Sequence, residues 1–394
     1  MNKISKIAII LLFIFCGYML TETINSPSQN AVRAICTGLS VDYSENEVEV
    51  SSQIVIPEAG GQYTQKLSIV EAKGKSIEEA LHKMEFYVGK KIRLGHCGFI
   101  VISKDFCDRD ITSNFDYFLR GNNLGNNTLL LFTEGKAKDI LKSASNVNSN
   151  EIDNLQINSK FNSKYLFSRS ANLLGFFNDY HSPHSTSHMP CLIVKKENKE
   201  KSSSGSEEQS SSSQTSTDSL RNDGSVAIFY QGRFAKLLNQ SECEDFNWLD
   251  TNLKNARIRL ENINAENLKN AQVTFTISQK KLKYRYSFIQ NQPTIEIDFS
   301  LGLKPEAISS ASLPPAYMDV VDSTVTSAIN QKIADSIENL LDIEREYGFD
   351  VFNFYREFNI YCHAEWKKYI ASLGDSHYLK NVRIITHATC FDDF

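Results

Sequence analysis

Three histidines in one short segment are the residues that most suggest chemistry in this chain. His181, His184 and His188 carry imidazole nitrogens, which are common zinc ligands. A zinc site also needs a rigid frame and supporting hydrogen bonds. Pro183 and the serines around it are instead typical of a loop. We therefore interpret the segment as a surface loop and assign no metal-binding residue.

Other catalytic patterns fail at a defining position. The Gly-Lys-Ser sequence at 74–76 resembles the end of a phosphate-binding P-loop, but the earlier glycine that the motif requires is Ile69. The sequence has no G-x-S-x-G, G-x-G-x-x-G or H-E-x-x-H motif. The carboxylate pair at 392–393 is expected to be inert on a fraying terminus. We predict a non-enzymatic protein without a cofactor and assign no catalytic or cofactor-binding residue.

The cysteines form no C-x-x-C pair, which argues against a zinc ribbon or a thioredoxin-like motif. They lie at positions 16, 36, 97, 107, 191, 243, 362 and 390. Most fall within apolar patterns and are interpreted as small buried side chains. One or two disulfides remain an alternative if the chain is exported.

The amino terminus has the pattern of an export signal. Lys3 and Lys6 precede an apolar run at 7–20, which is shorter than the about 20 residues that a membrane-spanning helix needs. Residues 1–30 are therefore predicted to be an export signal or membrane anchor plus a polar tether.

Composition places the rest among folded proteins. The chain has 394 residues, 41% of them hydrophobic, and a net charge of −5. This length accommodates two or three domains. A nucleic-acid partner is not expected, because such proteins carry a basic surface.

Residues 31–194 are predicted to form an N-terminal α/β domain. A hairpin at 31–41 and 48–56 should have one solvent-exposed face, since apolar residues alternate in its second strand. Ser76 and Glu79 form a capping box at the start of a helix. Further strands are predicted at 66–72, 99–102, 128–132 and 190–194, and further helices at 111–119 and from 137.

Three more segments complete the predicted α+β, multi-domain architecture. Residues 195–223 are a disordered serine-rich linker or loop, because they cannot bury enough apolar area to fold. Residues 224–262 are a small middle module with strands at 226–230 and 234–238. Its helix should start at a Ser241–Glu244 capping box and end near 248–249.

Residues 263–394 are predicted to form a C-terminal antiparallel sheet packed by a long helix. Period-2 alternation indicates strands at 273–277, 282–288 and 295–299, with a basic row opposite an acidic row. The helix should run over 318–347 and pack on the sheet with its apolar stripe, and the last strand should cover 382–390.

Several stretches in this order resemble the Ger(x)C family, the C subunits of spore germinant receptors. The matching residues are Gly-Lys-Ser-Ile-Glu-Glu-Ala-Leu at 74–81, Gly95-His96, and the segments at 34–42, 116–120, 135–141, 227–229, 248–249, 346–352 and 366–368. The resemblance implies a membrane-attached subunit on the outer face of the inner spore membrane. It also implies polytopic A and B subunits as partners and a role in nutrient-triggered germination.

The mode of membrane attachment has two alternatives. The family resembles bacterial lipoproteins, which makes Cys16 the candidate lipid attachment site. Phe15 stands where a small residue is expected, so an uncleaved anchor is the other reading. The alternative function is a tethered solute-binding protein or a secreted hydrolase. The germinant, and whether this subunit binds it, are not encoded in any motif that we find.

Overall fold

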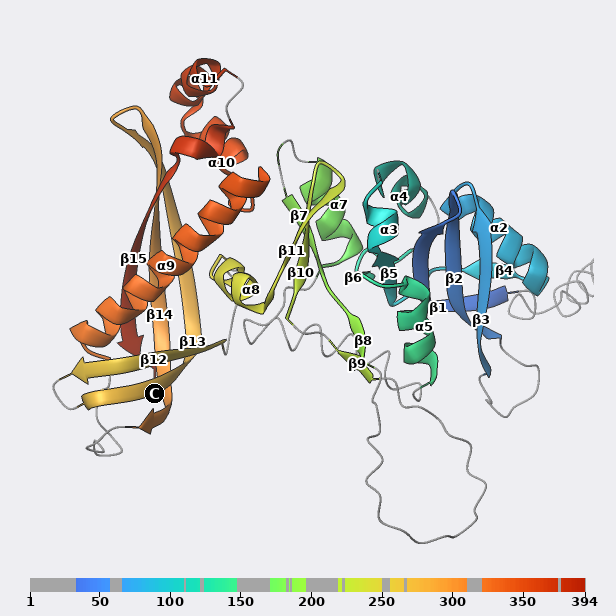
Figure 1. The fold of residues 1–394 in the computed structure, drawn as a ribbon, viewed down its shortest axis with the longest axis horizontal. Helices are drawn as coiled ribbons and strands as arrows, with labels where there is room; N and C mark the ends of the chain where they lie inside the picture. The colour runs from blue at the N-terminus through green and yellow to red at the C-terminus, as the bar shows by residue number, and fades with distance from the viewer. Residues whose placement is uncertain are drawn as a thin grey trace, which may run out of the picture.

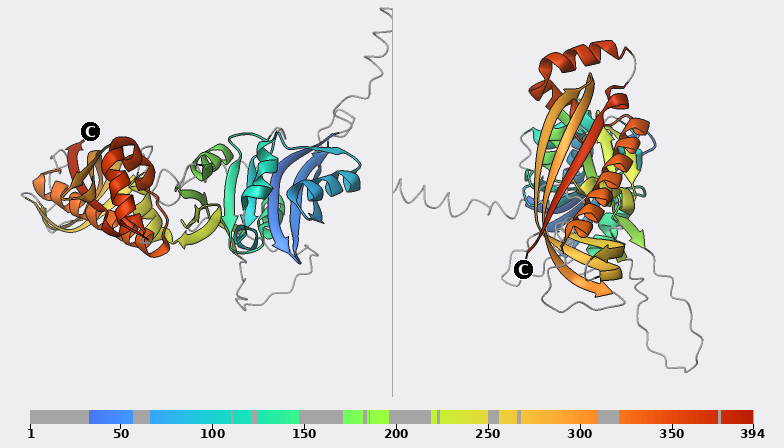
Figure 2. Two further views of the ribbon diagram at one scale, coloured as in Figure 1. Left: turned by 90° about the horizontal axis from the view of Figure 1, so that it is seen from above. Right: turned by 90° about the vertical axis from the view of Figure 1, so that its left-hand side faces the viewer.

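The first sheet of the protein is mixed and lies at one end of an elongated molecule (Figures 1 and 2). The computed structural model describes residues 33–56, 66–109, 111–120, 124–146, 171–181, 184, 186–195, 219–221, 224–249, 256–265, 268–309, 321–374 and 377–393. The strands of the first sheet are β1 (Arg33–Ser44), β2 (Glu47–Ile56), β3 (Lys66–Gly74), β4 (Lys91–Arg93), β5 (Phe99–Ser103) and β6 (Leu129–Thr133). Their order is β3-β2-β1-β5-β6, and β4 pairs with the start of β1. The predicted strands at 66–72, 99–102 and 128–132 are confirmed.

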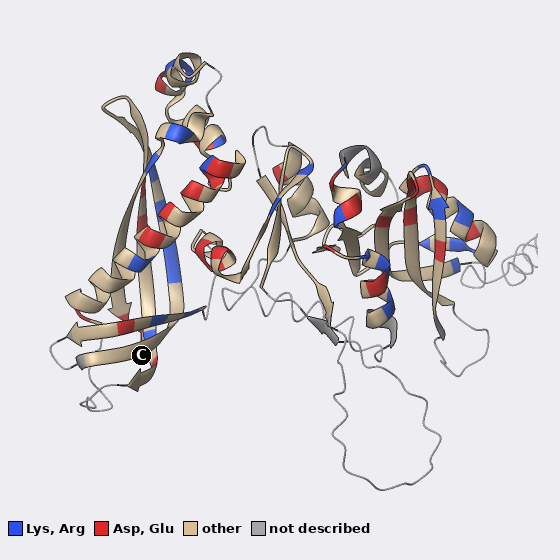
Figure 3. Ribbon diagram, in the orientation of Figure 1, with Lys and Arg blue, Asp and Glu red and all other residues tan. Residues whose placement is uncertain are grey.

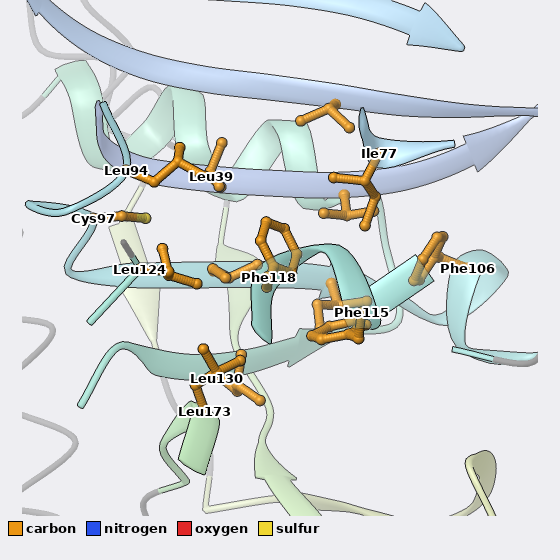
Figure 4. Close-up of a cluster of buried hydrophobic side chains, with 14 of the residues drawn as sticks. Leu39, Ile77, Leu94, Cys97, Phe106, Phe115, Phe118, Leu124, Leu130 and Leu173 are labelled. Atoms are coloured by element: carbon orange, nitrogen blue, oxygen red, sulfur yellow. The ribbon is translucent and has the colours of Figure 1, made fainter. Parts of the chain in front are cut away.

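Helices cover both faces of this sheet. They are α2 (Ile77–Val88), α3 (Lys104–Cys107), α4 (Ile111–Leu119) and α5 (Ala137–Asn146). One core contains the apolar faces of α2 and α4, and a second core beneath the other face contains α5. In Figure 4, Phe115 and Phe118 of α4 lie among side chains of β1, β6 and α7 (Leu173–His181).

The prediction that one face of the β1–β2 hairpin is exposed to solvent is partly wrong. Ser51, Gln53 and Val55 are buried although they point away from α2. They lie on the face that α5 covers, and the sequence of the hairpin alone gave no sign of that helix. Gly38 also lies on this face, where an added Cβ would come within 2.5 Å of the Phe99 ring. The ring therefore requires a glycine at this position.

The predicted start of α2 is confirmed. The Ser76 hydroxyl accepts the Glu79 N–H at 3.2 Å, and the Glu79 carboxylate accepts the Lys75 N–H at 2.9 Å. Gly89 ends the helix in the left-handed region at φ 66°.

A small antiparallel sheet occupies the middle of the molecule (Figure 1). Its order is β11 (Arg233–Leu238), β10 (Val226–Tyr230), β7 (Thr186–Pro190), with α7 (Leu173–His181) and α8 (Gln240–Asn247) beside it. The predicted strands at 226–230 and 234–238 are confirmed. The return strand predicted at 190–194 is present in part, because β7 ends at Pro190 and β8 (Ile193–Lys195) covers its last two residues. The interpretation of the histidine segment as a loop is wrong from Thr186 onward, since β7 begins there.

The ends of the serine-rich tract pair with each other. β8 (Ile193–Lys195) and β9 (Ser219–Arg221) form a two-stranded antiparallel sheet. The two ends of the tract are therefore held together, while residues 196–218 lie outside the described part.

Helix α8 starts earlier than predicted, because its capping box joins Asn239 with Glu242. Asn239 is thus the cap, and Ser241 lies inside α8.

The C-terminal sheet has the order β12 (Ala256–Ala265), β13 (Leu268–Ile289), β14 (Gln292–Ser309), β15 (Arg383–Asp392). The strands predicted at 273–277 and 282–288 are one continuous strand of 22 residues. A register shift between Ile277 and Gln279 absorbs the change of pattern that suggested a turn. Lys280 is buried, with its amine 3.2 Å from the Asn247 carbonyl oxygen. β15 runs parallel to β14, so the sheet is antiparallel only in its first three strands.

The long helix α9 (Ser323–Tyr347) packs across this sheet as predicted (Figure 1). It begins later than predicted because Asp322 caps it by accepting the Val325 N–H at 2.8 Å. The shorter elements α10 (Phe354–Tyr361), α11 (His363–Ser372) and η1 (Tyr378–Asn381) follow. The carboxylate pair at 392–393 does not fray: the Asp393 carboxylate accepts the Ser278 hydroxyl, and its N–H donates to the Leu303 carbonyl at 3.0 Å.

Candidate functional site

His184 and His188 are used in packing, whereas His181 ends a helix and its side chain lies outside the described part of the structure. The His184 ring stacks on Tyr355 with centroids 3.9 Å apart, and its Nδ1 lies 3.3 Å from the Tyr230 hydroxyl. His188 lies in β7 and meets the Phe246 ring edge-on at 5.7 Å. Within the described residues, no group of three or more His, Cys, Asp or Glu side chains is placed to hold a metal ion.

The other residues considered for chemistry also have structural roles. The Gly-Lys-Ser sequence at 74–76 caps α2, as described above. The seven described cysteines form no disulfide with one another, and five of them are buried, which confirms the packing interpretation for those five. The candidate lipid attachment residue Cys16 lies outside the described residues.

Two carboxylates that the sequence analysis missed form a buried acidic junction, which we define as Glu344 and Asp350. Both side chains are completely inaccessible. The Asp350 carboxylate accepts the N–H groups of Phe354 and Tyr355 at 2.9 and 3.0 Å. It also accepts the Tyr378 hydroxyl at 2.7 Å. Asp350 therefore fixes the start of α10 and joins it to η1.

The same junction touches the central sheet. The backbone N–H of Asp350 donates to the Thr186 hydroxyl in β7 at 3.0 Å. Glu344, near the end of α9, accepts the N–H groups of Val351 and Phe352 with one oxygen. Its second oxygen is buried without a hydrogen-bond partner. Glu344 thus holds the turn after α9, and the backbone of Asp350 joins that turn to the central sheet.

Burial shifts the protonation of this junction. Desolvation raises the pKa of Asp350 to about 6, against the lowering effect of its backbone hydrogen bonds. Desolvation and the nearby Asp350 charge raise the pKa of Glu344 well above its ordinary value. Desolvation and Asp350 likewise raise the pKa of Tyr378. Shifted values can mark catalytic groups, but here the hydrogen bonds of both acids hold backbone in place.

A signal for Glu344 was present in the sequence. It follows Ile337, Leu340 and Leu341 at helical spacing, so it lies on the apolar stripe of α9. An acid on such a stripe is buried and needs partners. Asp350 carried no comparable signal, because its partners come from η1 and from the backbone of α10.

The substitution Glu344→Gln should stabilise the protein at neutral pH and flatten its pH dependence. The folded state holds a proton on Glu344 that the unfolded chain, with a pKa of 4.5, has released. This contribution to the free energy of unfolding is full below the unfolded pKa and is lost as pH rises toward the folded pKa. Glutamine keeps an acceptor oxygen and cannot ionise.

Melting temperatures measured near about pH 5 and about pH 8 test this expectation. Glu338→Gln is the matched control, because Glu338 lies on the same helix with its side chain 57% exposed. The control should keep the wild-type pH dependence. Equal pH dependence in Glu344→Gln and the wild type would contradict the prediction.

An aromatic groove follows the upper part of β13. Its volume is about 850 Å³, and it is lined by residues 282–287 together with Glu296, Glu357 and Tyr361. Tyr286 stacks on Tyr361 with centroids 5.3 Å apart. Residues 279–289 of β13 pair with β14 on one side, whereas β12 pairs with residues up to Ile277. The groove therefore borders a strand edge that no other described strand covers.

The predicted charge rows on the C-terminal sheet are confirmed in part. Arg285 bonds Glu296 through Nε at 2.9 Å and Asp298 through a second nitrogen at 3.1 Å. These groups are exposed, so the pairing contributes little to stability.

Comparison with known proteins identifies the family to which this architecture belongs. A model described as the spore germination protein N-terminal domain matches residues 32–194. A model described as spore germination B3/GerAC-like, C-terminal, matches residues 224–389. The chain belongs to the Ger(x)C family of spore germination proteins. This family is not a known enzyme family.

A solved structure supports the same fold for the Ger(x)C chain. The crystal structure of the GerBC protein is similar with a TM-score of 0.51 and 12% sequence identity. The alignment covers 90% of this chain and 96% of the GerBC chain. At this identity the likeness concerns the fold alone. No curated protein matches the chain significantly.

Proposed function

We propose that this protein is the C subunit of a spore germinant receptor. It is exported, attached to the outer face of the inner spore membrane, and assembled with polytopic A and B subunits to enable nutrient-triggered germination. The observation that carries the proposal is the presence of both family domains in one chain whose fold is similar to GerBC over most of its length.

The amino terminus supplies the proposed attachment. The apolar run at 7–20 acts as the anchor, or Cys16 carries a lipid. Among the helices that the structure describes, none is long and apolar enough to cross a membrane.

The proposed role is non-enzymatic and rests on shape. In the described part of the chain, the two buried acids bond backbone N–H groups and a tyrosine hydroxyl, and His184 and His188 pack on aromatic rings. The protein holds its sheets in a fixed arrangement and offers their outer surfaces to the A and B subunits.

Deletion of residues 7–20 should move the protein from the membrane fraction to the soluble fraction and abolish the nutrient response of spores. The reason is that assembly with polytopic subunits requires delivery to the membrane surface. Cell fractionation and the germination of spores on nutrients measure the two effects. Cys16→Ser separates the anchors: it reproduces the deletion if a lipid is the anchor and has no effect if the apolar run is.

The control is the unaltered gene returned to a strain that lacks it, which should restore both properties. Co-purification of the full chain with multi-span membrane proteins tests the assembly directly. A normal response of gene-deleted spores to every nutrient would overturn the assignment. Co-purification with a transporter ATPase would favour a solute-binding protein instead.

A further inference from the structure

The last turn of α2 exposes two adjacent aromatic side chains. Phe86 is 84% exposed and Tyr87 is 65% exposed. Their rings meet edge-on with centroids 6.3 Å apart. Single exposed apolar residues are ordinary on protein surfaces. Two large neighbouring rings at the end of a helix form a contiguous exposed apolar patch, and such patches mark interaction sites.

Basic residues follow these rings in the sequence, at Lys90, Lys91 and Arg93. Gly89 turns the chain after α2, and β4 then runs parallel to the start of β1, which sets Lys91 beside Arg33 and Arg93 beside Ile35. Figure 3 shows Lys and Arg positions on β4 at this end of the molecule. The acid nearest in sequence, Glu85, accepts the Ile92 N–H at 2.9 Å. The end of α2 is therefore aromatic and positively charged.

This surface lies where the chain enters the structure. Residue 33 begins β1, and residues 21–32 separate it from the apolar run at 7–20. A fully extended chain spans at most roughly 3.3–3.6 Å per residue, so this connection reaches at most about 43 Å. The C-terminal sheet lies at the opposite end of the molecule (Figures 1 and 2). The end of α2 therefore lies at the end of the fold where the chain arrives from the proposed anchor.

From these observations we infer that the end of α2 and β4 form a second contact with the membrane, made with anionic phospholipid. This inference rests on the proposed attachment to a membrane. Phe86 and Tyr87 enter the headgroup region, where amphipathic aromatic rings are favoured. Lys90 and Lys91 lie against the phosphate groups, where each basic residue adds to the attraction.

The chemistry favours lipid over a protein partner at this point. Aromatic rings beside lysines are typical of membrane interfaces, whereas the residues of protein hot spots lie in packed pockets with a polar rim. The aromatic groove on the C-terminal sheet differs from the end of α2 in this respect. There Tyr361 stacks on Tyr286 beside an open strand edge. Contact with the bilayer also sets the orientation of the elongated molecule, with its C-terminal sheet directed away from the lipid.

Photocrosslinking of the full chain in vesicles of phosphatidylglycerol and phosphatidylcholine tests this contact. Benzoylphenylalanine is introduced in place of Tyr87 or, as the matched control, in place of Tyr361, which is 66% exposed. Flotation with the vesicles reports the anchor independently. We expect flotation of both proteins, with lipid adducts several-fold more abundant at position 87 than at 361.

The double substitution Lys90→Glu and Lys91→Glu should lower the adduct yield at position 87 by roughly tenfold on anionic vesicles and leave it nearly unchanged on phosphatidylcholine alone. Flotation without lipid adducts at position 87 would overturn the contact and leave the anchor in place. Adducts to a protein instead of lipid, in native membranes, would show a docking site and equally overturn it. Failure to float would overturn both the attachment and the contact.

Discussion

Replacing Asp350 with alanine is expected to lower the free energy of unfolding by about 4 kcal/mol, because it strands several buried donors at once. The carboxylate accepts two backbone N–H groups, from Phe354 and Tyr355, and the Tyr378 hydroxyl. Alanine offers none of these donors an acceptor, and the site is closed to solvent. Urea unfolding followed by circular dichroism measures the loss.

Asp335→Ala is the control for Asp350→Ala. Asp335 is exposed on α9, where it accepts the Gln331 side-chain amide at 2.7 Å. The change in its free energy of unfolding should stay within about 0.5 kcal/mol. A loss at Asp350 no larger than at Asp335 would show that the junction does not stabilise the fold.

Asp350→Asn separates hydrogen bonding from charge. Asparagine keeps one acceptor oxygen but places an amide NH₂ group near the remaining donors. The free energy of unfolding of Asp350→Asn should therefore lie between those of the wild type and Asp350→Ala. Because Asp350 also bonds Thr186 through its backbone, which neither substitution removes, the central sheet should remain attached in Asp350→Asn.

Local patterns were enough to predict most helices and strands. The Ser76 cap of α2, the apolar strands β5 and β6 and the stripe of α9 depend on residues near one another in sequence, and the structure has them. The predicted capping box of α2 differs in one bond, because Glu79 accepts the N–H of Lys75 instead of that of Ser76. Local patterns failed where a partner comes from far along the chain. The buried second face of β2 depends on α5, and the continuity of β13 depends on its pairing with β14.

The acidic junction shows the same limit. Glu344 stood on a recognisable apolar stripe, but its neighbours come from the turn after α9. The role of Asp350 depends on its hydrogen bonds to Tyr378, which lies later in the chain, and to Thr186, which lies much earlier. No spacing rule connects these positions. The exposed rings at the end of α2 were similarly hidden, because a helical pattern identifies the buried face and leaves the exposed residues without distinction.

The division of the chain into an N-terminal domain, residues 31–194, and a middle module, residues 224–262, remains a proposal. β7 belongs to the first range and pairs with β10 of the second. The two ranges also share a core, since Phe132 of β6 and Phe229 of β10 lie in one buried cluster. We therefore propose that these two ranges unfold together.

Phe132→Ala tests that coupling and should lower the free energy of unfolding by about 4 kcal/mol, the usual cost of removing a buried ring. Phe132 is fully buried and stacks on Phe234 with centroids 5.3 Å apart and planes 4° apart. It meets Phe229 edge-on at 6.1 Å. The cavity opens between the first sheet and the central sheet, so amides of β5, β6 and β10 should lose hydrogen-exchange protection together.

Phe86→Ala is the matched control, since it removes the same side chain from a site that is 84% exposed. Its effect on the free energy of unfolding should stay within about 0.5 kcal/mol. Wild-type protection of the β10 amides in Phe132→Ala, alongside weakened protection of β5 and β6, would show that the middle module folds independently. Joint loss would instead mean that the first and central sheets behave as one body, so that a contact between α2 and the bilayer fixes the position of both.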